Sequence, residues 1–181
     1  MISDIFVPFA AVGLAELGDK TQLTVLCLAS KTRSHFELLL GIILAFVMAD
    51  GSAIILGNFI TTHIPVYYIK TASGIIFILF GIITLMSKKQ EDAACDLKKP
   101  FASGFLLIFI SEMGDKTQIA AGLFATKFEP VMVFIGVISV LTILSVVAIY
   151  LGRFIVLRLN RKIVSNVAGI VFILVGVFCL F

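Results

Sequence analysis

Two seven-residue segments, 16–22 and 112–118, carry acidic, basic and hydroxyl side chains in one shared order. Both read Glu-x-Gly-Asp-Lys-Thr-Gln, and they start 96 positions apart. Their carboxylate, hydroxyl and amide groups offer oxygen atoms, which hard cations such as Mg²⁺, Ca²⁺ and Mn²⁺ prefer, and neither segment has the imidazole or thiolate typical of zinc and copper sites. The candidate metal ligands are Glu16, Asp19, Glu112 and Asp115, with Thr21, Gln22, Thr117 and Gln118 as neutral oxygen donors close by.

The rest of the chain is apolar enough to require lipid as its solvent. Of the 181 residues, 60% are hydrophobic and only 14% are charged, whereas a soluble domain has roughly a quarter charged residues. A spanning helix needs about 20 mostly apolar residues, and its backbone must hydrogen-bond within the segment. Six stretches meet this length and predict an all-α integral membrane protein with six transmembrane helices: Ile5–Leu28, Leu38–Ile60, Val66–Met86, Phe101–Phe124, Val131–Val156 and Ile163–Phe181.

The two motifs fall near the middle of the first and fourth predicted spans. Because positions i, i+3 and i+4 of a helix share a face, the acids and the lysine of each motif are expected to point the same way. If the two motif helices cross, four carboxylates converge. Gly18 and Gly114 are compatible either with close helix approach or with local unwinding that frees backbone carbonyls.

Charge counting favours a doubly charged ligand at these motifs. Each motif has two acids and one lysine, so the pair carries a net charge of −2 when all are ionised, which one divalent cation would neutralise. A charge at the bilayer centre costs roughly 2.5–3.5 kcal/mol, and packing alone gives no reason to bear that cost twice. The alternative is that Lys20 and Lys116 satisfy the acids as buried ion pairs. Both interpretations hold if the lysines pair with the acids while no cation is bound.

Asp50 is a further acid inside a predicted span, and its position in the repeat is taken by Ser145. Two interpretations stay open. Buried carboxylates suit proton relays, so Asp50 is a candidate proton-carrying or accessory group. Otherwise it is an acid near a helix end that bonds to Ser52 or to the backbone.

The similarity between the two halves extends beyond the motifs. Leu56-Gly57 matches Leu151-Gly152, and Gly74 and Gly81 match Gly169 and Gly176, at a spacing of 95. Because each copy has three spans, the second enters from the opposite side of the membrane, which predicts an inverted-topology repeat with its site near the midplane. The expected units are residues 1–86, a polar cytoplasmic linker at 87–100, and residues 101–181.

Basic residues gather on one side of the predicted spans. Ten lie in or beside the connections after spans one, three and five, and two lie on the other side. Since positive loops stay in the cytoplasm, both termini are expected outside. The ten are Lys31, Arg33, Lys88, Lys89, Lys98, Lys99, Arg153, Arg158, Arg161 and Lys162, and the two are Lys70 and Lys127.

These features favour a secondary transporter that moves a divalent cation through the bilayer. No phosphate-binding loop, nucleophile elbow or zinc-protease motif is present, so an enzyme is not expected. The net charge of +3 does not indicate nucleic-acid binding. The alternatives are a divalent-cation channel, which needs a continuous pore, and a membrane scaffold or accessory subunit without transport. No permanently bound cofactor is expected, and monomer and homodimer stay open.

The doubled Glu-x-Gly-Asp-Lys-Thr motif of a six-span chain resembles the signature of the Gdt-type cation exchanger family, which includes a bacterial manganese exporter and Golgi manganese/calcium–proton exchangers. The resemblance covers essentially the whole chain and shows no departure within either motif. It implies export of Mn²⁺, or next Ca²⁺, from the cytoplasm in exchange for protons, with Glu16, Asp19, Glu112 and Asp115 as cation ligands. The short linker and the lack of a targeting extension resemble the bacterial members, so the expected location is a bacterial inner (plasma) membrane.

Overall fold

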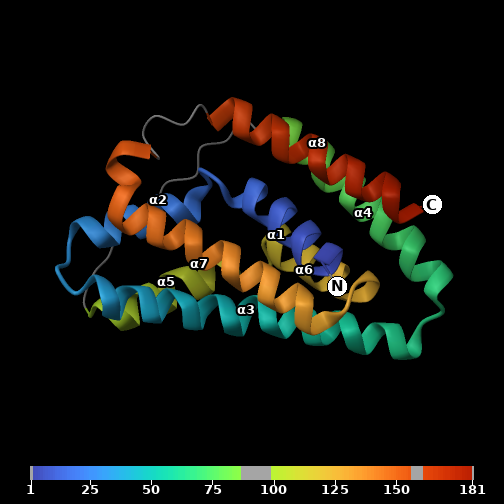
Figure 1. Ribbon diagram of the computed structural model, residues 1–181, viewed down its shortest axis with the longest axis horizontal. Helices are drawn as coiled ribbons and strands as arrows, with labels where there is room; N and C mark the ends of the chain where they lie inside the picture. The colour runs from blue at the N-terminus through green and yellow to red at the C-terminus, as the bar shows by residue number, and fades with distance from the viewer. Residues whose placement is uncertain (1, 87–98, 156–160, 181) are drawn as a thin grey trace.

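The computed structural model describes residues 2–86, 99–155 and 161–180, and all secondary structure in these ranges is helical (Figure 1). Three of the helices are long and apolar enough to cross a membrane, over His35–Thr61, Tyr67–Met86 and Pro130–Leu151, and two shorter apolar helical stretches cover Pro100–Glu112 and Asn166–Leu180. The helices are α1 (Ile2–Glu16), α2 (Lys20–Ser30), α3 (His35–His63), α4 (Val66–Met86), α5 (Pro100–Glu112), α6 (Lys116–Lys127), α7 (Pro130–Ile155) and α8 (Arg161–Leu180).

The prediction of one continuous helix for each motif span was wrong. The predicted span Ile5–Leu28 consists of α1 and α2, and the predicted span Phe101–Phe124 consists of α5 and α6. Both breaks fall inside the motif, where the glycine adopts a positive φ, 79° at Gly18 and 81° at Gly114. A right-handed helix cannot contain that backbone conformation, so the helix ends before the glycine and a new one begins after it.

The two halves of the chain interlock instead of packing as separate units. Helix α1 lies along α7, and its repeat equivalent α5 lies along α3, so each half supplies the neighbour of the other half's long helix. Gly41 and Gly136, which are equivalent in the repeat, make these approaches close. A Cβ atom on Gly136 would lie 2.6 Å from the Ile5 carbonyl oxygen, and one on Gly41 would collide with the carbonyl oxygen of Phe101.

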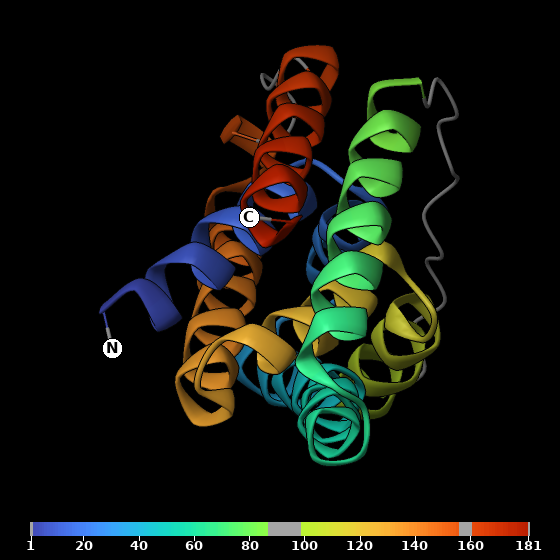
Figure 2. The same cartoon turned by 90° about the vertical axis from the view of Figure 1, so that its right-hand side faces the viewer.

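Helices α4 and α8 form the third reciprocal pair and lie side by side along one side of the molecule (Figures 1 and 2). Their repeated glycines face one another. A Cβ atom on Gly81 would lie 2.6 Å from the Gly169 oxygen, and one on Gly176 would lie 2.8 Å from the Gly74 oxygen. The glycines noted as repeats in the sequence therefore allow the close contact between the two helices.

Both termini lie toward the same end of the long axis as the α3–α4 turn, whereas the α2–α3 turn and the start of α5 lie toward the opposite end (Figure 1). Large apolar side chains cover much of the outside, as Ile55 (71% exposed) and Ile110 (69% exposed) illustrate. An apolar exterior of this extent fits lipid contact. Residues 87–98 of the predicted linker lie outside the described residues, and the division of the chain at that linker stays a prediction.

Candidate cation site

Each motif forms a turn that ends one helix and begins the next, and the same bonds hold both turns. The amide of Asp19 donates to the Glu16 carbonyl at 3.1 Å, and the equivalent bond from Asp115 to Glu112 measures 3.0 Å. Asp19 and Asp115 then stand at the N-caps of α2 and α6, both with extended backbone. The Asp19 side chain accepts a bond from the Lys20 amide at 2.7 Å. An aspartate at this position is a preferred helix start, so the sequence itself favours the break.

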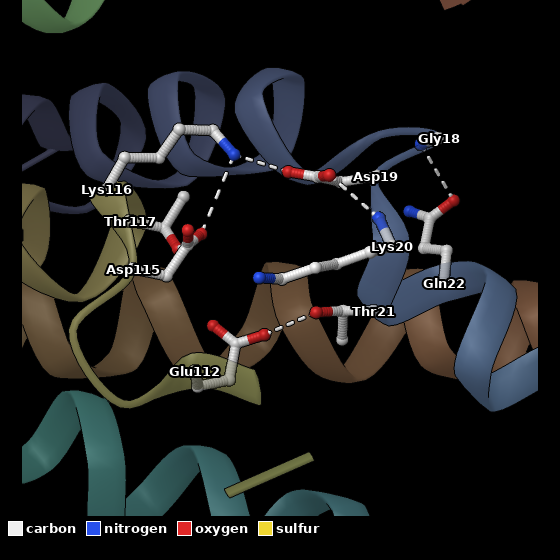
Figure 3. Close-up of polar contacts among 9 residues, drawn as sticks. All are labelled: Gly18, Asp19, Lys20, Thr21, Gln22, Glu112, Asp115, Lys116 and Thr117. Atoms are coloured by element: carbon white, nitrogen blue, oxygen red, sulfur yellow. Dashed lines mark hydrogen bonds and ion pairs between the residues drawn. The ribbon is translucent and has the colours of Figure 1, made fainter. Parts of the chain in front are cut away.

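The two glutamines of the motifs close these turns. Gln22 Oε1 accepts a bond from the Gly18 amide at 3.0 Å (Figure 3), and Gln118 Oε1 accepts one from the Gly114 amide at 2.7 Å. Both glutamines were predicted to offer neutral oxygens to a cation. In the structure each of these oxygens accepts a bond from an amide that the helix break leaves without an intrahelical acceptor, and their role as cation ligands stays a prediction.

Three of the four predicted carboxylates come together from the two turns. Glu16, Asp19 and Asp115 each offer an oxygen, and these atoms lie within 4.8 Å of one another. Glu16 is 2% exposed, while the side chains of Asp19 and Asp115 are 31% and 22% exposed. The cluster therefore has one buried acid and two acids that still reach solvent.

The helical-face argument that predicted this meeting was wrong in its geometry. Because the helix stops between Glu16 and Asp19, the two residues do not share a helix face. Instead, Asp19 contacts Lys116 of the other motif, and Glu112 contacts Thr21 of the other motif (Figure 3).

The fourth carboxylate, Glu112, lies apart from the cluster of three and contacts the other motif. It is fully buried, and its Oε1 accepts a bond of 2.7 Å from the Thr21 hydroxyl. Its second oxygen has no hydrogen-bond partner among the described residues. Thr21 thus satisfies a carboxylate of the opposite repeat, whereas Thr117 donates to Asp115 of its own turn at 3.3 Å.

Lys116 supplies the positive charge among the three clustered acids. Its ammonium group donates to Asp19 of the opposite motif and lies 3.6 Å from Asp115 Oδ2 (Figure 3). Lys20 extends from the start of α2 toward Asp115 in the same view. The expected pairing between lysines and acids is therefore present for Lys116, and it links the two repeats.

Asp50 lies near the middle of α3 and is fully buried. Neither of its oxygens has a hydrogen-bond partner in the described parts of the chain. The Ser52 hydroxyl donates to the Ala49 carbonyl at 2.7 Å, so the interpretation of Asp50 as a helix-end acid bonded to Ser52 was wrong. Its charge would act on Glu16, Glu112 and Asp115.

A small cavity of about 10 Å³ adjoins Glu16, which is roughly the room that one water molecule needs. Ser145 lines it, together with Thr21, Gln22 and Leu144. The sequence marks Ser145 only as the residue that breaks the symmetry with Asp50. Ser145 lies 95 positions after Asp50, which is the repeat spacing. Because equivalent positions of a repeat have equivalent surroundings, this spacing is the signal that could have placed Ser145 beside the motif.

The described fold and the acid cluster define an all-helical, apolar protein with charged residues at its centre, the class to which membrane ion transporters belong. The chain matches the sequence profile of the family described as "Divalent cation/proton antiporter GDT1" over residues 4–92 and 100–181. It belongs to this family, as the doubled motif predicted. The family is one of transporters, so membership gives no support to an enzymatic activity.

Two bacterial relatives are similar to the chain along nearly all of its length. A Vibrio cholerae protein named "Putative manganese exporter" is 26% identical, covering 97% of this chain and 90% of its own. A GDT1-like protein of Synechocystis is 29% identical, covering 92% and 91%. Protein PAM71 of Arabidopsis thaliana chloroplasts is 45% identical over 58 residues, 32% of this chain and 16% of its own. No solved structure matches the chain significantly.

Proposed function

We propose that this chain exports Mn²⁺ from the cytoplasm in exchange for protons and that the acids of the two motif turns bind the cation. The observation that carries the proposal is the meeting of three carboxylates from both repeats within 4.8 Å. Hard oxygen donors of this kind suit Mn²⁺ and Ca²⁺. Manganese is the first choice because the relative from Vibrio cholerae is named for its export; Ca²⁺ is the second.

The proposed architecture is six spans in two inverted three-helix repeats, in which α1–α2 and α5–α6 each form one broken span. Reciprocal packing of α1 on α7 and of α5 on α3 supports it, as does the position of both termini toward one end of the molecule. Interrupted helices of this kind suit ion sites near the midplane, because irregular backbone at that depth is tolerated where it lines a site. The basic connections then face the cytoplasm of a bacterial plasma membrane, and both termini face outside.

In the proposed cycle Lys116 and the cation compete for the same acids. A divalent ion that enters between Asp19 and Asp115 replaces the ammonium group, which now pairs with both. Glu16 is the third ligand, and Glu112 joins when the ion displaces the Thr21 hydroxyl from it. Rocking of one repeat against the other then exposes the ion on the far side. Protons that bind the vacated carboxylates and Asp50 together drive the return.

Asp50 is the proposed proton-carrying or accessory group of this cycle. A fully buried carboxylate without a hydrogen-bond partner is costly when it is charged, and Asp50 has neither exposure nor a partner among the described residues. It stands outside the group of three clustered acids. A proton on Asp50 therefore does not occupy an oxygen that the cation needs.

Transport by purified protein in liposomes tests the site. Uptake of Mn²⁺, Ca²⁺ and Mg²⁺ is measured under an imposed pH gradient for the native chain, D19N and D115N, with E37Q as the control because Glu37 is an exposed acid at the start of α3. We expect uphill, saturable Mn²⁺ transport that falls by about tenfold or more in both site variants, since metal sites lose at least this much when a supporting group is removed.

The same measurement separates the alternatives. Transport by D19N and D115N at the rate of E37Q would remove the acids from the site. Flux that never saturates and never runs uphill would indicate a channel, and no flux from folded native protein would favour a scaffold. Ca²⁺ transported faster than Mn²⁺ would change the choice of ion.

The role of Asp50 is tested with D50N, and S145A serves as the control at the equivalent repeat position. We expect D50N to keep saturable Mn²⁺ binding and to lose the stimulation of transport by a pH gradient, because the amide cannot carry the proton. S145A is expected to keep that stimulation. If D50N responds to the gradient like the native protein, Asp50 is not the proton carrier.

A further inference from the structure

The two motif turns are equivalent in sequence, but their glutamines differ in one hydrogen bond. Besides closing its own turn, Gln118 donates from Nε2 to the Ala49 carbonyl of α3 at 3.0 Å. This bond joins the second motif to the long helix of the first repeat. Because Ala49 directly precedes Asp50, the same bond also holds the second motif against the helix that carries the buried acid.

The equivalent bond is missing from the first motif. Gln22 Nε2 is buried and has no hydrogen-bond partner among the described residues. The Gly18 amide donates to the other end of the side chain, so the atom that faces Gly18 must be the oxygen and the NH₂ group must point away. Position 144 is equivalent to Ala49 at the repeat spacing of 95, and Leu144 lines the small cavity that Gln22 also lines. Gln22 and the residue equivalent to Ala49 therefore line one cavity.

A second bond between the halves has the same asymmetry. Thr21 donates to Glu112 across the repeat at 2.7 Å, whereas the equivalent Thr117 turns to Asp115 of its own motif at 3.3 Å. Glu16, which is the equivalent of Glu112, keeps its Oε1 buried and without a partner among the described residues. Both missing bonds belong to the side of the site that contains the cavity.

We propose that Gln22 and Gln118 are alternating latches, each of which holds one of the two conformations of the transport cycle. In the conformation described here Gln118 Nε2 is bonded to the Ala49 carbonyl, whereas Gln22 Nε2 has no partner among the described residues. In the other conformation the cavity closes, Gln22 Nε2 donates to the Leu144 carbonyl, Thr117 donates to Glu16, and the bond from Gln118 to Ala49 breaks. When the protein passes from one state to the other, the hydrogen bonds of one repeat break and the equivalent bonds of the other repeat form.

This exchange makes the two conformations close in free energy, because each state has one satisfied latch and one unsatisfied latch. A carrier needs such a balance, since a large difference would leave one side of the membrane without binding-competent protein. The inference rests on the proposed transport function. Both glutamines act by positioning the turns, and neither is required to touch the cation.

The test compares Q22M and Q118M in liposomes where all molecules have one orientation, with the KM for Mn²⁺ measured from each side. Methionine keeps the length of the side chain and removes both hydrogen bonds. Each variant loses the bond that closes its own turn, so this loss is the same in both. Each variant is therefore the control for the other. Removing one net hydrogen bond shifts a two-state balance by roughly fivefold.

We expect the ratio of the two KM values to shift about fivefold in opposite directions in Q22M and Q118M, and to return toward the native ratio in the double variant. Shifts in the same direction, or unchanged ratios, would overturn the latch proposal while leaving transport intact. Failure of the native chain to transport Mn²⁺ at all would instead overturn the proposed function. A variant that misfolds is replaced by the leucine variant at the same position, under the same criterion.

Discussion

At the scale of single residues, Lys116 decides how the acids of the site are held together. Without it, three carboxylate oxygens within 4.8 Å would repel one another strongly in a medium of low dielectric constant. Its ammonium group bonds to Asp19 and lies 3.6 Å from Asp115, in the place where a cation would find oxygen ligands. In the proposed cycle Lys116 is therefore an internal cation that the transported ion displaces.

Replacing this lysine by methionine should strengthen cation binding and slow release. In K116M we expect the KM for Mn²⁺ to fall by on the order of tenfold, about 1.4 kcal/mol, because the competing charge is gone. The maximal rate should fall as well, since the ion then leaves a more negative site. Transport kinetics in liposomes check both values, with K70M as control because Lys70 is exposed in α4. A KM that does not fall would show that Lys116 does not compete with the cation.

At the scale of helices, the breaks at Gly18 and Gly114 create the site. Each break starts a new helix with an aspartate at its N-cap, and these two aspartates form the acid cluster together with Glu16. The cost is low only because glycine adopts φ values near +80° without steric penalty. The turn-closing glutamines then satisfy the amides of these glycines.

Gly114 isolates the conformational part of this requirement. A Cβ atom there would meet no heavy atom within 4 Å, so G114A adds no collision and changes only the backbone preference. We expect G114A to lower the free energy of unfolding by about 1–2 kcal/mol and to impair Mn²⁺ transport.

Thermal unfolding in detergent measures the loss, with G51A as the control. Gly51 lies inside helix α3, where an added Cβ would approach only the edge of the Phe134 ring at 3.3 Å. Equal stability of G114A and the native chain would contradict a requirement for the positive φ.

At the scale of the whole molecule, the interlocked repeats place two distant segments of sequence in one site. Helix α1 packs on α7 and helix α5 on α3, so the motif turns at the ends of α1 and α5 meet in the middle. The two ends of the molecule's long axis differ in charge and in the segments they carry. The basic α2–α3 turn lies toward one end, and both termini lie toward the other (Figure 1).

Orientation in the cell should follow this distribution of charge. We expect tags at either terminus to be accessible to membrane-impermeant reagents in intact cells, because the basic connections are retained in the cytoplasm. A cysteine at Ser34, in the α2–α3 turn, should react only after the membrane is opened. Labelling at Ser34 in intact cells would reverse the proposed direction of transport.

The sequence by itself determined the class of protein and the residues to consider. Apolar composition, six apolar stretches and the doubled motif sufficed for an all-helical protein of the antiporter family, because hydropathy and repetition are readable without coordinates. They also predicted a group of four motif acids, of which the structure brings Glu16, Asp19 and Asp115 together. Only the tertiary structure decided how these acids meet, which acid stands apart, and that Gln118 Nε2 bonds to Ala49 while Gln22 Nε2 has no partner among the described residues. A repeat in sequence fixes which interactions are equivalent, but the side-chain contacts of a given conformation decide which of them form.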